Sequence, residues 1–117
     1  MNIEIAPNRA IKYLNLSDAI MYCFALDLDG KTGWRLPTNQ ELAEIIPHRV
    51  PWDWYWMDQN KLSTDEIDAI CKNTRWPSQL GISMVYCIYE DGSEPLINYE
   101  AWDVTETNMV IPVRGIK

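Results

Sequence analysis

The chain has 117 residues, of which 47% are hydrophobic and 23% charged, a composition typical of one folded domain over residues 1–117 and not of a disordered chain. Its 17 Asp and Glu outnumber its 10 Lys and Arg, which gives a formal net charge of −7 and excludes a protein that holds nucleic acid by its phosphates. No run of about 18 apolar residues is present, so no membrane-spanning helix is expected.

The first predicted elements are short strands and a helix. Residues 3–14 mix β-branched and polar side chains around a turn at Pro7-Asn8, which predicts one or two short strands. Ser17 is placed to cap a helix over 18–28, and we expect that helix to stop at Asp29-Gly30, where glycine accommodates a left-handed backbone. Because the apolar residues of this helix cover a wide arc, we predict that it is mostly buried.

The second predicted helix has a sharper start. Thr38 is placed to cap it, and Glu41 follows three residues later, which is the spacing of a capping box. Pro37 precedes the cap and can pack on Leu42 as a hydrophobic staple. We expect this helix to run to about Ile46.

An aromatic segment and a third helix follow. Three tryptophans alternate with Asp and Tyr over residues 52–56, so they would share one face if the segment is extended. Ser63 and Glu66 form a second capping box, which predicts a helix over about 64–73.

The period of the pattern changes in the last third of the chain. Residues 82–89, 95–102 and 109–113 are typical of strands, and Asp91-Gly92 favours a tight turn between the first two. Helices in the first half and an antiparallel meander in the second predict an α+β fold.

The cysteines and the N-terminus indicate a cellular compartment. Cys23, Cys71 and Cys87 are odd in number, widely separated and free of CxxC spacing, so we expect three reduced thiols rather than a disulfide framework. Residues 1–5 lack the basic and apolar regions of a secretory signal. Together these features predict a cytoplasmic protein.

Residues 33–42, Gly-Trp-Arg-Leu-Pro-Thr-Asn-Gln-Glu-Leu, resemble the signature of bacterial and phage domains with a C-type-lectin-like fold. The similarity is greatest to the domain of unknown function at the C-terminus of a collagen-like adhesin, and formylglycine-generating enzymes are more distant relatives. Cys23, the pair Tyr55-Trp56 and the closing residues 110–115 agree in order. The resemblance implies paired terminal strands, an antiparallel sheet flanked by two main helices, and a variable central excursion that here holds an additional short helix.

Two departures from this family matter. Many of its members join a cysteine of the first helix to one in the last strand, at the position aligned with Pro112, so Cys23 lacks that partner here. Calcium-dependent lectins carry two sugar-binding motifs, whereas this chain has only Glu94-Pro95 and Trp102-Asp103, too close together. Four residues could supply oxygen ligands to calcium: Glu94, Asn98, Glu100 and Asp103. In an acidic meander such residues are more often solvated side chains at strand edges, so we expect no metal site.

Catalytic chemistry finds little support. His48 is the only histidine, and no Ser, Cys or Asp near it in sequence indicates a nucleophile and its base. The cysteine spacings match no common zinc ligand pair. We therefore predict a protein that is not an enzyme and has no catalytic residue and no cofactor.

Several residues of the signature have structural interpretations. A semi-buried Arg35 needs a partner, and Glu41 is the nearest candidate. Trp34 is expected in the core, as the family motif implies. The residues interpreted as a structural motif are Trp34, Arg35, Pro37, Thr38 and Glu41.

Residues 50–60 hold more aromatic surface than one short strand usually buries. Trp56 matches a family position and is predicted to be core, whereas Trp52 and Trp54 are open between core and contact surface. Aromatic side chains serve as anchors in protein interfaces. The predicted partner-binding residues are Trp52, Asp53, Trp54, Tyr55, Asp58 and Trp76.

The functional prediction is a cytoplasmic protein-binding module that offers an aromatic and acidic surface to a protein with a basic patch. The resemblance suggests a phage or mobile-element protein that inhibits or redirects a host protein. Two alternatives stay open: a lectin-like domain that binds carbohydrate or a small ligand, with or without calcium, and an acidic mimic of nucleic acid. No direct nucleic-acid or membrane binding is expected.

Overall fold

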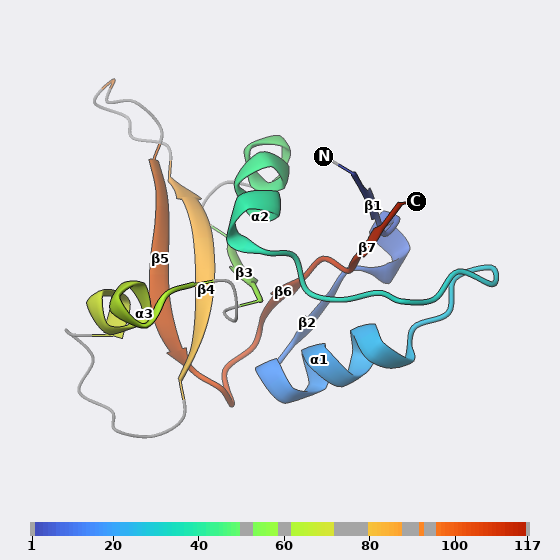
Figure 1. Ribbon diagram of the computed structural model, residues 1–117, viewed down its shortest axis with the longest axis horizontal. Helices are drawn as coiled ribbons and strands as arrows, with labels where there is room; N and C mark the ends of the chain where they lie inside the picture. The colour runs from blue at the N-terminus through green and yellow to red at the C-terminus, as the bar shows by residue number, and fades with distance from the viewer. Residues whose placement is uncertain are drawn as a thin grey trace.

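The computed structural model describes residues 2–49, 53–58, 62–71, 80–87, 92 and 96–116, with the description of 70, 71, 80 and 101–103 limited to the backbone. It is an α+β structure with two sheets (Figure 1). Its elements are β1 (Ile3–Ile5), η1 (Asn8–Ala10), β2 (Lys12–Leu14), α1 (Leu16–Ala25), α2 (Asn39–Ile45), η2 (Ile46–His48), β3 (Trp54–Trp56), α3 (Thr64–Cys71), β4 (Leu80–Cys87), β5 (Leu96–Asp103), β6 (Asn108–Val110) and β7 (Val113–Gly115).

The larger sheet has the strand order β2-β6-β3-β4-β5 in the part of the chain described. Strands β4 and β5 form its longest antiparallel pair, over eight register positions from Leu80 to Cys87. Strand β6 lies between β2 and β3, antiparallel to the first and parallel to the second. The sheet is therefore mixed, and the predicted simple meander is wrong.

The predicted strand over 109–113 is two strands. β6 ends at Val110 in the larger sheet, and β7 begins at Val113 in a two-stranded sheet with β1. Pro112 lies between them and lacks a backbone N–H, which a continuous ladder would require. Its carbonyl accepts a hydrogen bond from Ala6 N–H at 2.9 Å.

The helices cover opposite faces of the larger sheet. Tyr55 and Trp56 are adjacent on β3, so their side chains point to opposite faces. Tyr55 packs in a core with residues of α2, whereas Trp56 packs in a second core with Ala19 and Cys23 of α1. The helix α1 therefore lies on one face, and α2 on the other.

Leu16 of α1 packs close to the sheet at Gly81 of β4. A Cβ atom on Gly81 would lie 2.6 Å from Leu16 Cδ2 and 2.8 Å from Trp56 Cζ3, closer than van der Waals contact permits. Trp56 is further fixed by its indole N–H, which donates to the Leu14 carbonyl at 2.7 Å. The first turn of α1 is thus fixed against the sheet backbone.

The start and end of α1 differ from the prediction. Its cap is Asn15, whose side chain accepts from Asp18 N–H at 2.8 Å, and Ser17 lies inside the helix. The helix ends at Ala25. Asp29 and Gly30 have positive φ values of 55° and 86° because they form a tight turn between Leu28 and Lys31, not a helix terminus.

The second and third helices begin as predicted. The Thr38 hydroxyl accepts from Glu41 N–H, and the Glu41 carboxylate accepts from Thr38 N–H, so the capping box of α2 is confirmed. Ser63 and Glu66 make the same reciprocal pair before α3. Residues 72–73, predicted to extend α3, and Asp91 lie outside the described residues; Gly92 has a φ of 84°, as a turn requires.

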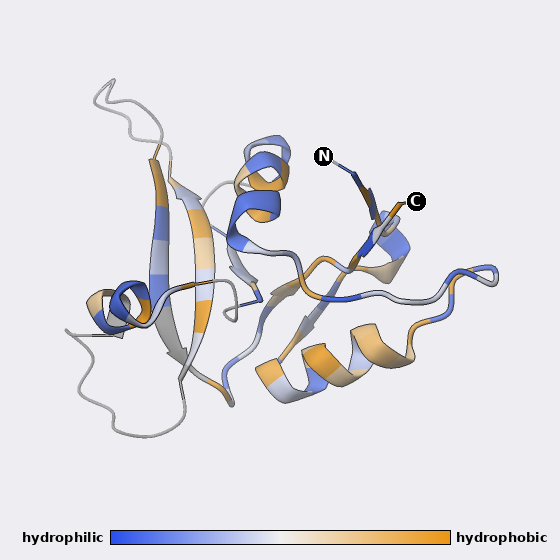
Figure 2. Ribbon diagram, in the orientation of Figure 1, coloured by the Kyte–Doolittle hydropathy of each residue, from blue (hydrophilic) through white to orange (hydrophobic). Residues whose placement is uncertain are grey.

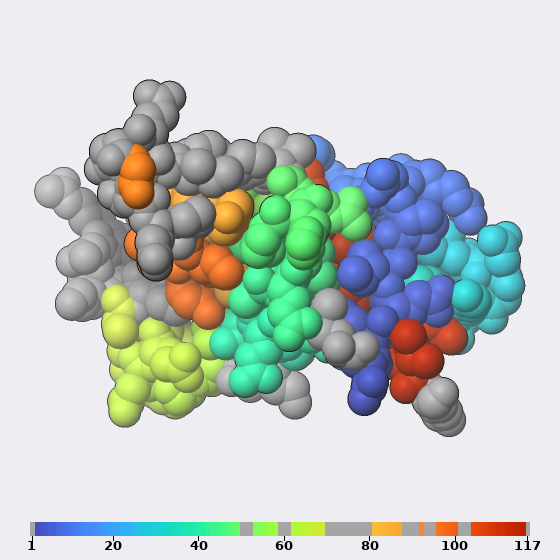
Figure 3. Space-filling model, turned by 90° about the horizontal axis from the view of Figure 1, so that it is seen from above, coloured from blue at the N-terminus to red at the C-terminus, as the bar shows by residue number. Residues whose placement is uncertain are grey.

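The two ends of the chain lie side by side. Ile3 pairs with Gly115 and Ile5 with Val113. In the space-filling view, the terminal strands lie on the right, α2 in the middle and α3 on the left (Figure 3). Val113 also exchanges two backbone hydrogen bonds with Arg35, at 2.8 and 2.9 Å. The segment that carries the Trp-Arg-Leu-Pro-Thr signature is thereby attached to β7.

Candidate functional site

The helix α1 carries a row of exposed apolar side chains, which we call the α1 row: Ile20, Met21 and Phe24. Their exposed fractions are 54%, 65% and 87%. The hydropathy colouring shows α1 as mostly hydrophobic, whereas hydrophilic residues interrupt α2 and α3 (Figure 2). The prediction that this helix is mostly buried is therefore wrong. Only the face with Ala19 and Cys23, one turn apart, lies on the sheet.

A groove runs beside the α1 row. It lies between α1 and the segment with Trp34 and Leu36, which Figure 1 shows running alongside the helix, and has a volume of about 350 Å³. This volume falls within the range of ligand-binding clefts. The lining is mainly apolar: Leu16, Ile20, Cys23, Phe24, Trp34, Arg35, Leu36, Met57 and Asp58.

One end of the groove is charged. Arg35 donates two hydrogen bonds to the Glu41 carboxylate, at 2.7 and 2.9 Å, which confirms the predicted pair. These bonds lower the pKa of Glu41 to about 2, although partial burial opposes the shift. Glu41, and to a lesser extent Asp58, also raises the pKa of Arg35. Of these three charged residues, Arg35 and Asp58 line the groove.

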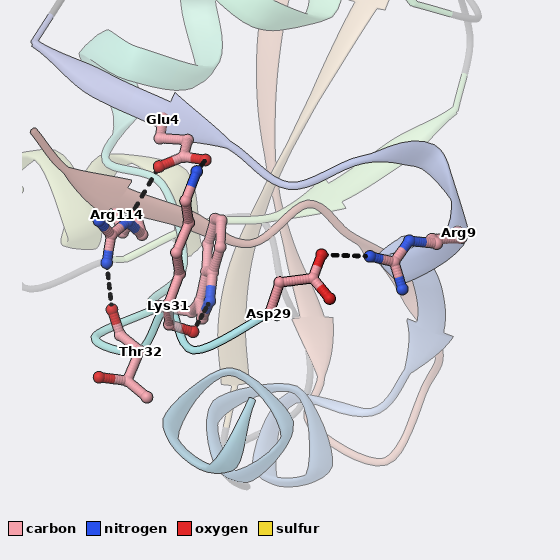
Figure 4. Close-up of polar contacts among 7 residues, drawn as sticks. Glu4, Arg9, Asp29, Lys31, Thr32 and Arg114 are labelled. Atoms are coloured by element: carbon pink, nitrogen blue, oxygen red, sulfur yellow. Dashed lines mark hydrogen bonds and ion pairs between the residues drawn. The ribbon is translucent and has the colours of Figure 1, made fainter. Parts of the chain in front are cut away.

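Glu4, Lys31 and Arg114 form an ion-pair cluster (Figure 4). This cluster positions Trp34, which forms one wall of the groove. The Trp34 indole N–H donates to the Lys31 carbonyl at 2.9 Å, and the Arg114 guanidinium carbon lies 5.8 Å from the centre of the ring, within range of a cation–π interaction. Arg114 and Lys31 both bind the Glu4 carboxylate, at 3.0 and 2.7 Å. Arg114 also donates to the Thr32 carbonyl. The ion pairs with Lys31 and Arg114 lower the pKa of Glu4.

The thiol of Cys23 lines the groove but is 1% exposed. Burial raises its pKa to about 12, so the thiol is protonated at neutral pH and is a poor nucleophile. Cys23 and Cys87 are both free, which confirms the prediction for these two. The side chain of Cys71 lies outside the described residues.

The predicted contact residues differ in burial and in their hydrogen bonds. Tyr55 is completely buried and cannot contact a partner, so that prediction is wrong; Trp56 is also completely buried, which confirms it as core. Asp53 accepts hydrogen bonds from the Tyr13 hydroxyl and from Trp54 N–H, and the first of these raises the pKa of Tyr13 to about 12. Trp54 is half-buried.

Of the predicted contact residues, Asp58 lines the groove. Trp52 and Trp76 lie outside the described residues. In the signature, Trp34 is 4% exposed, which confirms the prediction that it lies in the core, and Pro37 is less than 2% exposed.

Sequence reasoning misses the α1 row because its apolar pattern also predicts a core helix. The useful indication was the width of the apolar arc on residues 18–28, since one helix face on one sheet buries only part of such an arc. Helix periodicity identifies the apolar residues of α1. It does not show which of them the rest of the chain covers.

Comparison of the chain with protein-family models, with curated proteins and with solved structures finds no match. Within the described residues, no three His, Cys, Asp or Glu side chains lie close enough to hold a metal ion. No helix there has the length and apolar character needed to cross a bilayer. The candidate site therefore stands on its own geometry, as an apolar groove with a charged end.

Proposed function

We propose that the protein is a non-enzymatic binding module that holds a partner protein against α1. The observation that carries this proposal is the exposure of Ile20, Met21 and Phe24, three large apolar side chains within five consecutive residues of one helix. Contiguous exposed apolar surface with polar residues around it is characteristic of interaction sites. On an ordinary helix, the positions that face solvent carry polar side chains.

The groove beside the α1 row strengthens this proposal. Its walls are held on both sides: Leu16 packs against Gly81 and Trp56, and Trp34 is fixed by Lys31 and Arg114. A preformed, rigid groove lowers the entropy cost of binding. Asp18 and Asp27, exposed near the two ends of α1, favour a partner with a basic patch.

We further propose a C-type-lectin-like scaffold and a cytoplasmic role in a phage or mobile element, where the module inhibits or redirects a host protein. Support for the scaffold comes from the pairing of β1 with β7 and from the position of the signature between β7 and α2. The free Cys23 and Cys87 support a reducing compartment.

The test is affinity capture from lysate of the natural host with three forms of the protein: wild type, Phe24→Ser and Leu96→Ser. Leu96 is the control because it is also an exposed large apolar residue, at 49% against 87% for Phe24, but lies on β5 rather than α1. We expect wild type and Leu96→Ser to retain the same protein in a stoichiometric complex, and Phe24→Ser to lose it. Equal capture by Phe24→Ser and wild type would contradict the proposal.

A further inference from the structure

We propose that the occupant of the groove is a basic amphipathic helix of the partner, with large apolar side chains on one face and Lys or Arg beside them. This inference rests on the proposed function and specifies the partner element. It is carried by the shape of the α1 row and groove and by the charges around them.

The shape of the site suits a helix. The helix α1 has 10 residues and is therefore about 15 Å long. Ile20 and Phe24 are four residues apart and line the groove along the helix axis. A second helix laid along this row would place apolar residues at i, i+4 and i+7 in the groove, as helix-binding grooves do.

The charges around the site favour a basic occupant. The neighbouring cations have acidic partners: Arg9 pairs with Asp29, Arg35 pairs with Glu41, and Lys31 and Arg114 share Glu4. Asp18 and Asp27 are exposed near the two ends of α1, and neither forms an ion pair among the described residues. No basic residue lies in the last turn of α1, so the partial negative charge of that helix end adds to these carboxylates.

The same charges disfavour two other occupants. A second copy of the chain would bring the carboxylates of two α1 surfaces together, on chains that each carry −7. An anionic membrane would repel the carboxylates that flank the apolar row. A helix with lysines or arginines beside its apolar face meets both requirements of the site.

The experiment uses three synthetic peptides of about 15 residues, the length that spans α1 with one turn to spare. One has leucines on one helical face and lysines on the other; the second replaces every lysine with glutamate; the third keeps the lysines and has a central proline. Binding to the full chain is followed by fluorescence anisotropy. We expect the lysine peptide to bind about tenfold or more tightly than either of the others.

Substitutions in the protein test whether the lysine peptide binds at the α1 row and groove. Phe24→Ser should weaken the lysine peptide about tenfold, whereas Leu96→Ser should leave its affinity unchanged. Asp18→Asn with Asp27→Asn removes two charges with little change in shape. This double variant should reduce the preference for lysine over glutamate, as should a rise in salt from about 0.05 to about 0.5 M.

Four results would overturn the inference, and they separate it from the proposed function. Equal binding of the lysine and glutamate peptides, both dependent on Phe24, would reject the basic character and leave the apolar site intact. Retention of the proline peptide would reject the helix. Phe24-dependent binding to zwitterionic lipid vesicles, with no peptide bound, would identify a membrane surface instead. Lysine-peptide binding that survives Phe24→Ser would reject the site itself.

Discussion

The helices α1 and α2 have similar N-caps but differ in the burial of their large apolar side chains. Each begins with a side-chain cap, Asn15 for α1 and Thr38 for α2. The helix α2 buries its large apolar residues, so that Leu42 is 0% and Ile45 4% exposed, whereas α1 leaves Phe24 87% exposed. Apolar residues of α2 thus contribute to the core, and those of the α1 row do not.

Under the proposed function, the α1 row serves binding rather than stability. The helix α1 is held to the sheet by small or modest side chains, Ala19 and Cys23, and by Leu16 on Gly81. Its largest apolar groups project away from that contact. Substitutions in the two helices should therefore separate stability from binding.

The largest expected effect is on α2. Leu42→Ala removes a completely buried side chain from the core around Tyr55 and Met84, so we expect the free energy of unfolding to fall by about 3 kcal/mol. Urea denaturation followed by tryptophan fluorescence measures this change. A loss below about 1 kcal/mol would mean that α2 is not packed as described.

The next effect is a pH dependence from the Arg35–Glu41 pair. Because the pKa of Glu41 is about 2 in the folded protein and higher when unfolded, the unfolded state binds a proton first as pH falls. Stability from this pair is therefore full above about pH 5 and lost toward about pH 2. We expect the pair to contribute about 2 kcal/mol to the free energy of unfolding. This figure already includes a reduction for solvent screening, because the Arg35 side chain is 41% exposed.

Glu41→Gln isolates that contribution from those of other carboxylates. The difference in unfolding free energy between wild type and Glu41→Gln should be largest near neutral pH and shrink as the pH falls, since a protonated Glu41 resembles glutamine. A difference that stays constant from neutral to acid pH would contradict the role assigned to the carboxylate charge.

The helix caps provide a smaller effect. Asn15→Ala should cost about 1 kcal/mol because the Asp18 N–H loses its acceptor, and Thr38→Ala should cost about the same for α2. Ser17→Ala should change stability by less than about 0.5 kcal/mol. Thermal and urea unfolding of the three variants checks the assignment, which fails if Ser17→Ala is the costly one.

The smallest effect is expected on the α1 row. Phe24→Ala should change the free energy of unfolding by less than about 0.5 kcal/mol, because an 87% exposed side chain contributes little to the core. The comparison with Leu42→Ala, measured under the same conditions, is the test. A loss near that of Leu42→Ala would show that Phe24 is covered in solution.

Local features of the fold could be predicted from the sequence. The capping box of Thr38 and Glu41 needs only residues three apart, and the Arg35–Glu41 pair needs only six. The α+β class follows from the change of period along the chain. These interactions are short in sequence, so their residue types are sufficient to indicate them.

Long-range pairings could not be predicted in the same way. The insertion of β6 between β2 and β3 depends on Tyr13, Tyr55 and Met109 meeting from three distant segments, which no local pattern encodes. The burial of Tyr55 and the exposure of Phe24 are consequences of this topology. The sequence therefore predicts contact residues on the segment 50–60 and at Trp76, whereas the groove lies beside α1, with Asp58 common to both.

The joined ends of the chain have a consequence for folding kinetics. Glu4 and Arg114 are 110 positions apart in sequence, so the β1–β7 sheet can close only after most of the intervening chain is ordered, or else at a large loop-closure cost. We expect this sheet to form after the main folding barrier. Arg114→Ala should accordingly speed unfolding while leaving the folding rate nearly unchanged, a result that a denaturant-dependent kinetic series would reveal.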